Sequence, residues 1–200
     1  MDKKTTKERI LETVIDLFSE KGYDGVGVDE IAESIGMKGP SLYRHFKGKE
    51  AILDAVISIG EDRYEDNFGS ADKLDYVPES MDKLIEMSLQ QINFTMHDPM
   101  IIKFRKIFAM EQFRNERIAE LTTKHTITGL MMMYAKIFSE MMQQGTLREG
   151  DPEILALEYL APVSMMIHMV DRQPEKEDMA MDVIKRHFVH FANIYNTESF

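Results

Sequence analysis

The chain of 200 residues is 44% hydrophobic, which is enough apolar material to bury a core. Its 24 Lys and Arg are outnumbered by 35 Asp and Glu, and the formal net charge of -11 is the reverse of the balance typical of a nucleic-acid-binding domain. Cysteine is absent, which excludes disulfides, thiolate zinc sites and cysteine nucleophiles and fits a reducing compartment.

The N-terminal stretch MDKKTTKERI contains no apolar signal region. The longest mostly apolar run, residues 160–170, is interrupted by Pro162, Ser164 and His168 and is shorter than the roughly 20 residues that a membrane-spanning helix needs. We therefore expect a soluble, cytoplasmic protein without a membrane partner.

Three helices are predicted in the first quarter of the chain. Residues 10–21 place apolar side chains at helical spacing before a glycine, and residues 28–35 do the same before Gly36. A third helix opens at Pro40, a residue suited to the first helical turn, and is anchored by Leu42 and Phe46. Two helices joined by a tight glycine turn are typical of a unit that reads the major groove of DNA.

The acidic excess lies mostly outside this segment. Residues 1–55 hold nine basic and eleven acidic side chains, a balance of -2, so -9 falls on the rest of the chain. Residues 36–49 contain four cations and no acid. A local positive patch of this kind suffices for contact with DNA phosphates, although an ordinary solvated face would show the same charges.

Candidate DNA contacts lie on the outward side of the third helix and just beyond it. Lys38 and Arg44 suit guanine acceptors, and Pro40 suits a thymine methyl group. The predicted DNA-binding residues are Lys38, Pro40, Ser41, Tyr43, Arg44, His45, Lys47 and Lys49.

This segment resembles the N-terminal domain of the TetR family of bacterial transcriptional regulators. The matching positions are Leu17-Phe18, Gly22-Tyr23, Ile31-Ala32, Gly36, Leu42-Tyr43-Arg44-His45-Phe46 and Lys49-Glu50. The resemblance implies a helix-turn-helix DNA-binding domain over residues 1–50, in which Tyr43, His45 and Lys49 contact phosphates. The chain departs from the family pattern at Gly27, where a hydroxyl residue usually caps the second helix, and at Lys38, where serine is more frequent.

The remainder of the chain is predicted to be helical throughout. A fourth helix runs from Lys49 toward Tyr64 and links two domains, and further helices are expected near residues 78–96, 99–112, 115–144, 152–171 and 176–196. No segment alternates as a strand would. The expected fold class is all-α, with a three-helix DNA-binding domain followed by a helical effector-binding and dimerisation domain at residues 51–200.

The last two predicted helices are apolar over more than one stripe, so they must be covered on several sides. A second copy of the chain would cover one side through a two-fold four-helix interface, as the family resemblance also implies. The predicted interface residues are Leu155, Tyr159, Met166, Ile184, Phe188, Phe191 and Tyr195. Two reading helices about 34 to 36 Å apart, one helical turn of DNA, would require a palindromic operator.

The middle helices are rich in Met and Phe, which suits either an ordinary core or a hydrophobic effector cavity. The predicted ligand-binding residues are Met87, Gln91, Phe94, Phe104, Phe108, Glu111, Met131, Tyr134, Phe138, Glu158 and His168. If Glu111 or Glu158 lined the cavity, a cationic compound would be favoured, whereas a neutral lining would favour acyl or aromatic compounds. The sequence leaves this choice open.

The sequence therefore predicts a ligand-responsive transcriptional regulator, in its commonest form a homodimeric repressor that leaves a palindromic operator when a hydrophobic or amphipathic small molecule binds. The alternative is a DNA-binding protein controlled by a protein partner. No catalytic motif is present, so we expect no enzyme and no cofactor. His187 and His190 share a helix face but lack the further ligands of a metal site, and no metal is expected.

Overall fold

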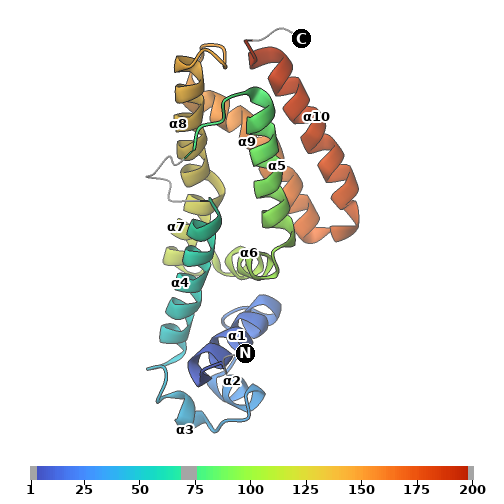
Figure 1. The fold of residues 1–200 in the computed structure, drawn as a ribbon. Coiled ribbons are helices and arrows are strands. Elements are labelled where there is room, and N and C mark those ends of the chain that lie inside the picture. The colour runs from blue at the N-terminus through green and yellow to red at the C-terminus, as the bar shows by residue number, and fades with distance from the viewer. Residues whose placement is uncertain (1–3, 69–75, 198–200) are drawn as a thin grey trace. The chain divides into compact units, whose positions relative to one another are not determined.

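The computed structural model describes residues 4–68 and 76–197, and these residues form helices joined by short turns (Figure 1). Over the described ranges, pairing of the β type is limited to one isolated bridge between Leu147 and Asn196. The predicted all-α fold class is confirmed.

Four helices make up the N-terminal part, and their bounds are α1 Thr6–Lys21, α2 Val28–Ser34, α3 Gly39–Leu42 and α4 Lys49–Phe68. A capping box starts α1, because the Glu8 backbone N–H donates to the Thr5 hydroxyl at 3.2 Å and the Thr5 backbone N–H donates to the Glu8 carboxylate at 2.7 Å. The third helix is shorter than predicted and ends in a turn after Leu42.

The later helices agree with the predicted ones to within a few residues. They are α5 Met81–His97, α6 Pro99–Glu111, α7 Glu116–Thr123, α8 Gly129–Gln143, α9 Pro152–Arg172 and α10 Glu177–Tyr195. Instead of the single helix expected at 115–144, the π-helical turn Lys124–Thr128 separates α7 from α8. Aspartates start two of these helices: Asp98 accepts the first free N–H groups of α6, and Asp151 accepts those of α9.

The chain divides into two compact units. The first unit contains residues 1–67 and 98–119 and so combines α1 to α4 with α6 and the start of α7. Ion pairs fasten α6 and α7 to the earlier helices, joining Lys103 to Asp16 and Arg117 to Asp54. The compact unit thus extends beyond residue 50, and the functional boundary predicted there stays a prediction.

The second unit contains residues 68–97 and 120–200, and its core is built by α5, α8, α9 and α10 (Figure 1). Aromatic rings fill the centre of this core. Tyr159 stacks on Phe188 with ring centroids 4.6 Å apart and meets Phe138 edge-on at 5.6 Å. Such pairs each contribute about 0.5 to 1.5 kcal/mol beyond the burial of their area.

A buried hydroxyl cluster lies within this aromatic core. The Ser88 hydroxyl donates to the Leu84 carbonyl at 2.8 Å and lies 3.0 Å from the Tyr134 hydroxyl and 2.9 Å from the Tyr159 hydroxyl. The Tyr134 hydroxyl donates to Gln91 Oε1 at 2.8 Å. Hydrogen bonds within the unit thus engage the hydroxyl groups of Ser88, Tyr134 and Tyr159.

Burial keeps these phenols neutral. It raises the pKa of Tyr134 to about 12 and raises the pKa of Tyr159 well above its usual value. Because the folded-state pKa of Tyr134 is higher than the unfolded value of 10.0, its contribution to stability is complete below pH 10 and is lost as the pH rises toward 12.

We expect the free energy of unfolding to fall by about 1.4 kcal/mol per pH unit for each buried tyrosine above pH 10. Urea unfolding followed between pH 8 and about 11.5 measures this loss. A Tyr134→Phe variant should be less stable at pH 8, because it lacks one hydroxyl, but should show a shallower alkaline decline. An equal decline in both proteins would contradict the assignment.

Candidate nucleic-acid interface

The turn between α2 and α3 is formed by Gly36, whose φ of +70° lies in the left-handed region that favours glycine. The Gly36 N–H donates to the Glu33 carbonyl at 3.0 Å, and the Met37 N–H donates to the Ala32 carbonyl at 2.8 Å. These bonds close the end of α2 and direct the chain into α3. Leu42, which is buried, anchors the short helix.

Segment 38–49 presents its polar side chains outward. Lys38, Pro40, Arg44, His45 and Lys47 are exposed, as is Tyr43 at 55%, whereas Ser41 and Lys49 are half-buried. All eight predicted DNA-binding residues are thus exposed or half-buried along one segment that starts at the N-cap of α3. We call residues 38–49 the basic segment.

Lys38 occupies the N-cap position of α3 with an extended backbone, and its side chain makes no capping bond. A cation at this end of a helix gains nothing from the helix dipole. The side chain is therefore left for an external anion or a base edge.

Two cations near the basic segment lie over aromatic rings. The Lys49 ammonium is 4.1 Å from the centroid of the Tyr23 ring, and the Lys7 ammonium is 5.5 Å from that of Phe46. Tyr23 itself packs edge-on against Phe18 with centroids 5.5 Å apart. Cation–π contact holds an ammonium group in place without neutralising its charge.

Three residues predicted to line an effector cavity lie in the first unit. Phe104 and Phe108 are buried on α6, and Glu111, at its end, accepts the Tyr23 backbone N–H at 2.8 Å. Phe104 also lies against Gly60 of α4, where a side chain would approach its ring to 3.0 Å. The contact of Glu111 with the corner between α1 and α2 was not predicted from the sequence. Its partner, the Tyr23 backbone N–H, belongs to the Gly22-Tyr23 motif, which the sequence does identify.

The other predicted ligand-binding residues lie in the second unit, where they differ in burial. Tyr134 and Phe138 are buried in its core. Met87, Gln91, Phe94 and Met131 are half-buried, and Glu158 and His168 are exposed on α9. Ser88, which links Tyr134 to Tyr159, was missed because a lone serine on an apolar helix carries no distinguishing pattern.

Five of the predicted interface residues, Leu155, Tyr159, Ile184, Phe188 and Phe191, are buried in the core of their own subunit. Met166 and Tyr195 pack against the same cluster but are partly exposed. The prediction that these residues meet a second copy stays a prediction.

Other apolar side chains of α9 and α10 are exposed. On α9 these include Leu157 and Met165, at 44% and 67%, and on α10 they include Val189 and Ile194, at 58% and 41%. By length and composition alone, α9 is apolar enough to cross a membrane. Only 22% of its most apolar stretch is buried within the chain. A helix of this kind in a globular unit presents an uncovered apolar face.

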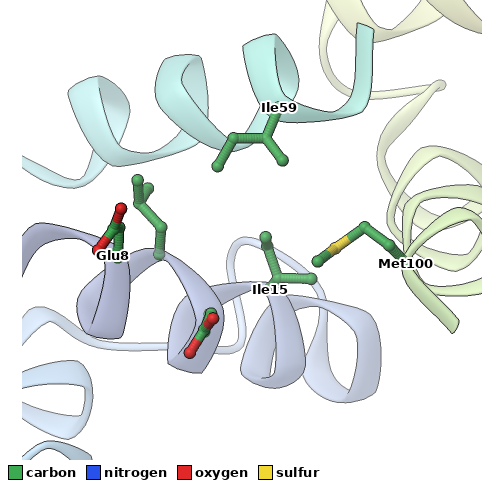
Figure 2. A pocket seen from close by; sticks show the side chains of 6 residues that line it. Glu8, Ile15, Ile59 and Met100 are labelled. Carbon is green, nitrogen blue, oxygen red and sulfur yellow. The ribbon is translucent and has the colours of Figure 1, made fainter. Parts of the chain in front are cut away.

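An open pocket of about 170 Å³ lies in the first unit between α1, α4 and α6 (Figure 2). Ile15, Ile59 and Met100 point into it, and Glu8 lies at its edge. The Glu8 carboxylate is already engaged by Thr5. The pocket is smaller than the roughly 300 to 1,000 Å³ of a typical small-molecule site. No group of three His, Cys, Asp or Glu side chains in the described ranges could hold a metal ion.

These features define a helix-turn-helix protein, and comparison with known proteins gives its family. Residues 10–56 match the family model of the bacterial regulatory proteins of the tetR family. The chain is 32% identical over 124 residues to IcaR of Staphylococcus epidermidis, the negative transcriptional regulator of the biofilm operon icaADBC, covering 48% of this chain and 67% of that protein. The chain belongs to the TetR family of bacterial transcriptional regulators.

Solved structures of the same fold agree with this assignment. SmeT, the repressor of the Stenotrophomonas maltophilia multidrug efflux pump SmeDEF, was solved with triclosan; that structure has a TM-score of 0.75 at 19% identity, covering 98% of this chain and 94% of the other. AibR, solved with isovaleryl coenzyme A and operator DNA, has a TM-score of 0.59 at 23% identity, covering 81% and 85%. At these identities the likeness shows the fold alone.

The N-terminus of α2 generates a testable prediction. Its N-cap residue Gly27 makes no side-chain bond, has an extended backbone, and leaves open space where a side chain would start. A Gly27→Thr variant should gain about 0.5 to 1 kcal/mol of stability, because a hydroxyl can cap α2 and the unfolded chain loses freedom.

Thermal or urea unfolding of Gly27→Thr measures this gain, and Gly27→Ala provides the matched control, since it restricts the unfolded chain but supplies no capping oxygen. A Gly27→Thr protein no more stable than Gly27→Ala would show that α2 does not use a hydroxyl cap at this position.

Proposed function

We propose that this protein is a homodimeric repressor that binds a palindromic operator through the basic segment and is released by an uncharged, largely apolar small molecule. The observation that carries the proposal is the exposed, acid-free surface of residues 38–49 at the start of α3. The similarity to IcaR, a negative transcriptional regulator, supports the sign of regulation.

Within the basic segment we assign two kinds of contact. Tyr43, His45 and Lys49 hold phosphates, and Lys49 does so from the first turn of α4, where free backbone N–H groups also favour an anion. Lys38, Pro40, Ser41 and Arg44 approach base edges from α3 and the residues that follow it. Lys47, which is exposed between His45 and Lys49 in the chain, adds positive charge beside the phosphate contacts.

Dimerisation is proposed through the exposed apolar face of α9 and α10, which includes Leu157, Met165, Val189 and Ile194. A second copy related by a two-fold axis would bury this face against itself. It would also provide two basic segments, which is why the operator is proposed to be palindromic.

The charge of the effector is inferred from the core of the second unit. Its buried or half-buried polar groups include the hydroxyls of Ser88 and Tyr134 and the amide of Gln91. The half-buried ring of His187 lies 3.0 Å from the Tyr159 carbonyl. Glu111 belongs to the first unit, and Glu158 is exposed and accepts a hydrogen bond from Tyr195 at 2.8 Å. Among the described residues of the second unit no carboxylate is buried, so a cationic ligand in this core would lack a counter-charge, and an uncharged ligand is favoured. The solved complexes of SmeT with triclosan and of AibR with isovaleryl coenzyme A are precedents for ligand binding on this fold.

Control by a protein partner remains the second candidate, and one surface feature favours it. Phe113 follows α6 in the first unit and is 89% exposed, and Met110 in the last turn of α6 is also exposed. An exposed aromatic side chain beside another apolar one is typical of protein contact. A Phe113→Ser variant that loses regulation in cells but still binds DNA would favour the partner.

DNA binding is tested by capturing genomic fragments with the purified protein at moderate salt and sequencing them. We expect enrichment of a palindrome by the wild-type protein. A Tyr43→Ala, Lys49→Ala variant should bind that DNA roughly 10- to 100-fold more weakly, because it lacks two phosphate contacts in each subunit. Lys185→Ala, an exposed substitution on α10, is the control for loss of one positive charge.

The effector is then sought by adding neutral and cationic amphiphiles of matched size to the protein–operator complex. Release by neutral compounds alone, weakened in a Gln91→Ala variant, is the expected result. Release by cationic compounds alone would contradict the proposal of an uncharged effector.

In the DNA-capture experiment, equal enrichment of DNA by the wild-type protein and the Tyr43→Ala, Lys49→Ala variant would contradict the proposed DNA contacts themselves.

A further inference from the structure

The carboxylate of Glu111 is buried at the end of α6, where only 3% of the residue is exposed. Among the described residues it is the one charged residue in the buried core. Burying a carboxylate is unfavourable unless hydrogen bonds replace its hydration. The group that donates a hydrogen bond to Glu111 therefore matters for the stability of this site.

That partner is the backbone of the corner between α1 and α2. The Tyr23 N–H donates to Glu111 Oε1 at 2.8 Å. A Cβ atom added to Gly22 would lie 2.9 Å from the same oxygen, so the carboxylate rests directly on the Gly22-Tyr23 peptide. Gly22 has a φ of +73°, a conformation that side-chain-bearing residues rarely adopt. The Gly22 N–H also donates to the Phe18 carbonyl at 3.0 Å, so the bond from α6 adds a tertiary contact to a corner that is closed locally as well.

The same corner places the ring of Tyr23. The ring packs edge-on against Phe18 with centroids 5.5 Å apart, and its other neighbour is the Lys49 ammonium, 4.1 Å from the ring centroid. Lysine has a long flexible side chain. When its ammonium is held over a ring, less conformational entropy is lost on binding a phosphate.

Carboxylates surround this ring: burial raises the pKa of Tyr23 most, followed by Glu50, Asp24, Asp54 and Glu111. Two of these carboxylates form ion pairs with residues that follow α6. Asp24 lies 3.7 Å from Arg114, and Asp54 lies 2.5 Å from Arg117. The ring can thus hold Lys49 while these two carboxylates are occupied by arginines.

We propose that Glu111 is a positioning residue for the contact between Lys49 and a DNA phosphate: it fixes the Tyr23 peptide, Tyr23 fixes the ammonium of Lys49, and the end of α6 thereby sets the strength of DNA binding. The inference rests on the proposed function, in which Lys49 meets DNA. It assigns to Glu111 a role at the nucleic-acid interface instead of in an effector cavity.

The test is the salt dependence of binding to a fluorescently labelled mixed-sequence DNA duplex, measured by anisotropy with the full-length protein. Each phosphate contact contributes about 0.9 to the slope of log K against log salt concentration, or about 1.8 for both subunits of a dimer. Lys49→Ala should reduce the slope by this amount. Glu111→Ala should reduce it equally, and the double variant should show no further reduction.

Two conservative variants separate positioning from folding. Glu111→Gln loses the same charge as Glu111→Ala but keeps an oxygen that can accept the Tyr23 N–H, so its slope should equal that of the wild-type protein. Tyr23→Phe keeps the ring and should also keep the slope. Tyr23→Leu leaves the backbone N–H for Glu111 but removes the ring, so its slope should be reduced as in Lys49→Ala. This variant tests the role of the ring even if Glu111→Ala fails to fold.

The outcomes distinguish this inference from the proposed function. If Lys49→Ala reduces the slope but Glu111→Ala and Tyr23→Leu do not, the positioning role is overturned while the DNA contact stands. A reduced affinity of Glu111→Ala with an unchanged slope would mean that Glu111 serves only the fold, and this also overturns the inference. If Lys49→Ala itself leaves the slope unchanged, the DNA contact fails and the positioning role fails with it.

Discussion

The hydrogen bond from the Tyr23 backbone N–H to the buried Glu111 carboxylate is the constraint around which the first unit is arranged. It requires α6 to lie on the corner between α1 and α2, and the ion pair between Lys103 and Asp16 fastens the same helix to α1. A buried charge tolerates little displacement, because its hydration is lost while its partner must stay within hydrogen-bond distance. The helices that carry the basic segment are therefore built together with α6 as one compact unit.

The second unit is stabilised in a different way. Aromatic rings of α8, α9 and α10 pack around Tyr159, and the Ser88 hydroxyl lies within hydrogen-bond distance of the hydroxyls of Tyr134 and Tyr159. Among the described residues of this unit no carboxylate, lysine or arginine is buried. The two units therefore differ in their buried polar groups: the first holds a carboxylate, Glu111, and the second holds hydroxyls.

The helices and the DNA-reading turn were largely predictable from the sequence, because they depend on local patterns. Gly36 marks the turn and Leu42 the anchor of α3, and most helix ends fall within a few residues of their predicted places. The placement of side chains on apolar helices was not predictable. Leu155 and Phe188 share a helical pattern with residues that could face a partner, yet they fill the core of their own chain. Periodicity identifies an apolar face, but not what covers it. Glu111 shows the same limit, since only tertiary packing brings it to Tyr23.

The central claim is that two basic segments, related by a two-fold axis, read one operator, and hydroxyl-radical footprinting of an enriched genomic fragment tests it most directly. The account predicts two protected regions of equal width, symmetric about a palindrome and separated by about 34 to 36 Å, one helical turn, or a multiple of it. A Leu157→Glu, Val189→Glu variant, which places charge on the exposed face of α9 and α10, should lose both regions together. A single protected region, or full protection by that variant as a monomer, would contradict the account.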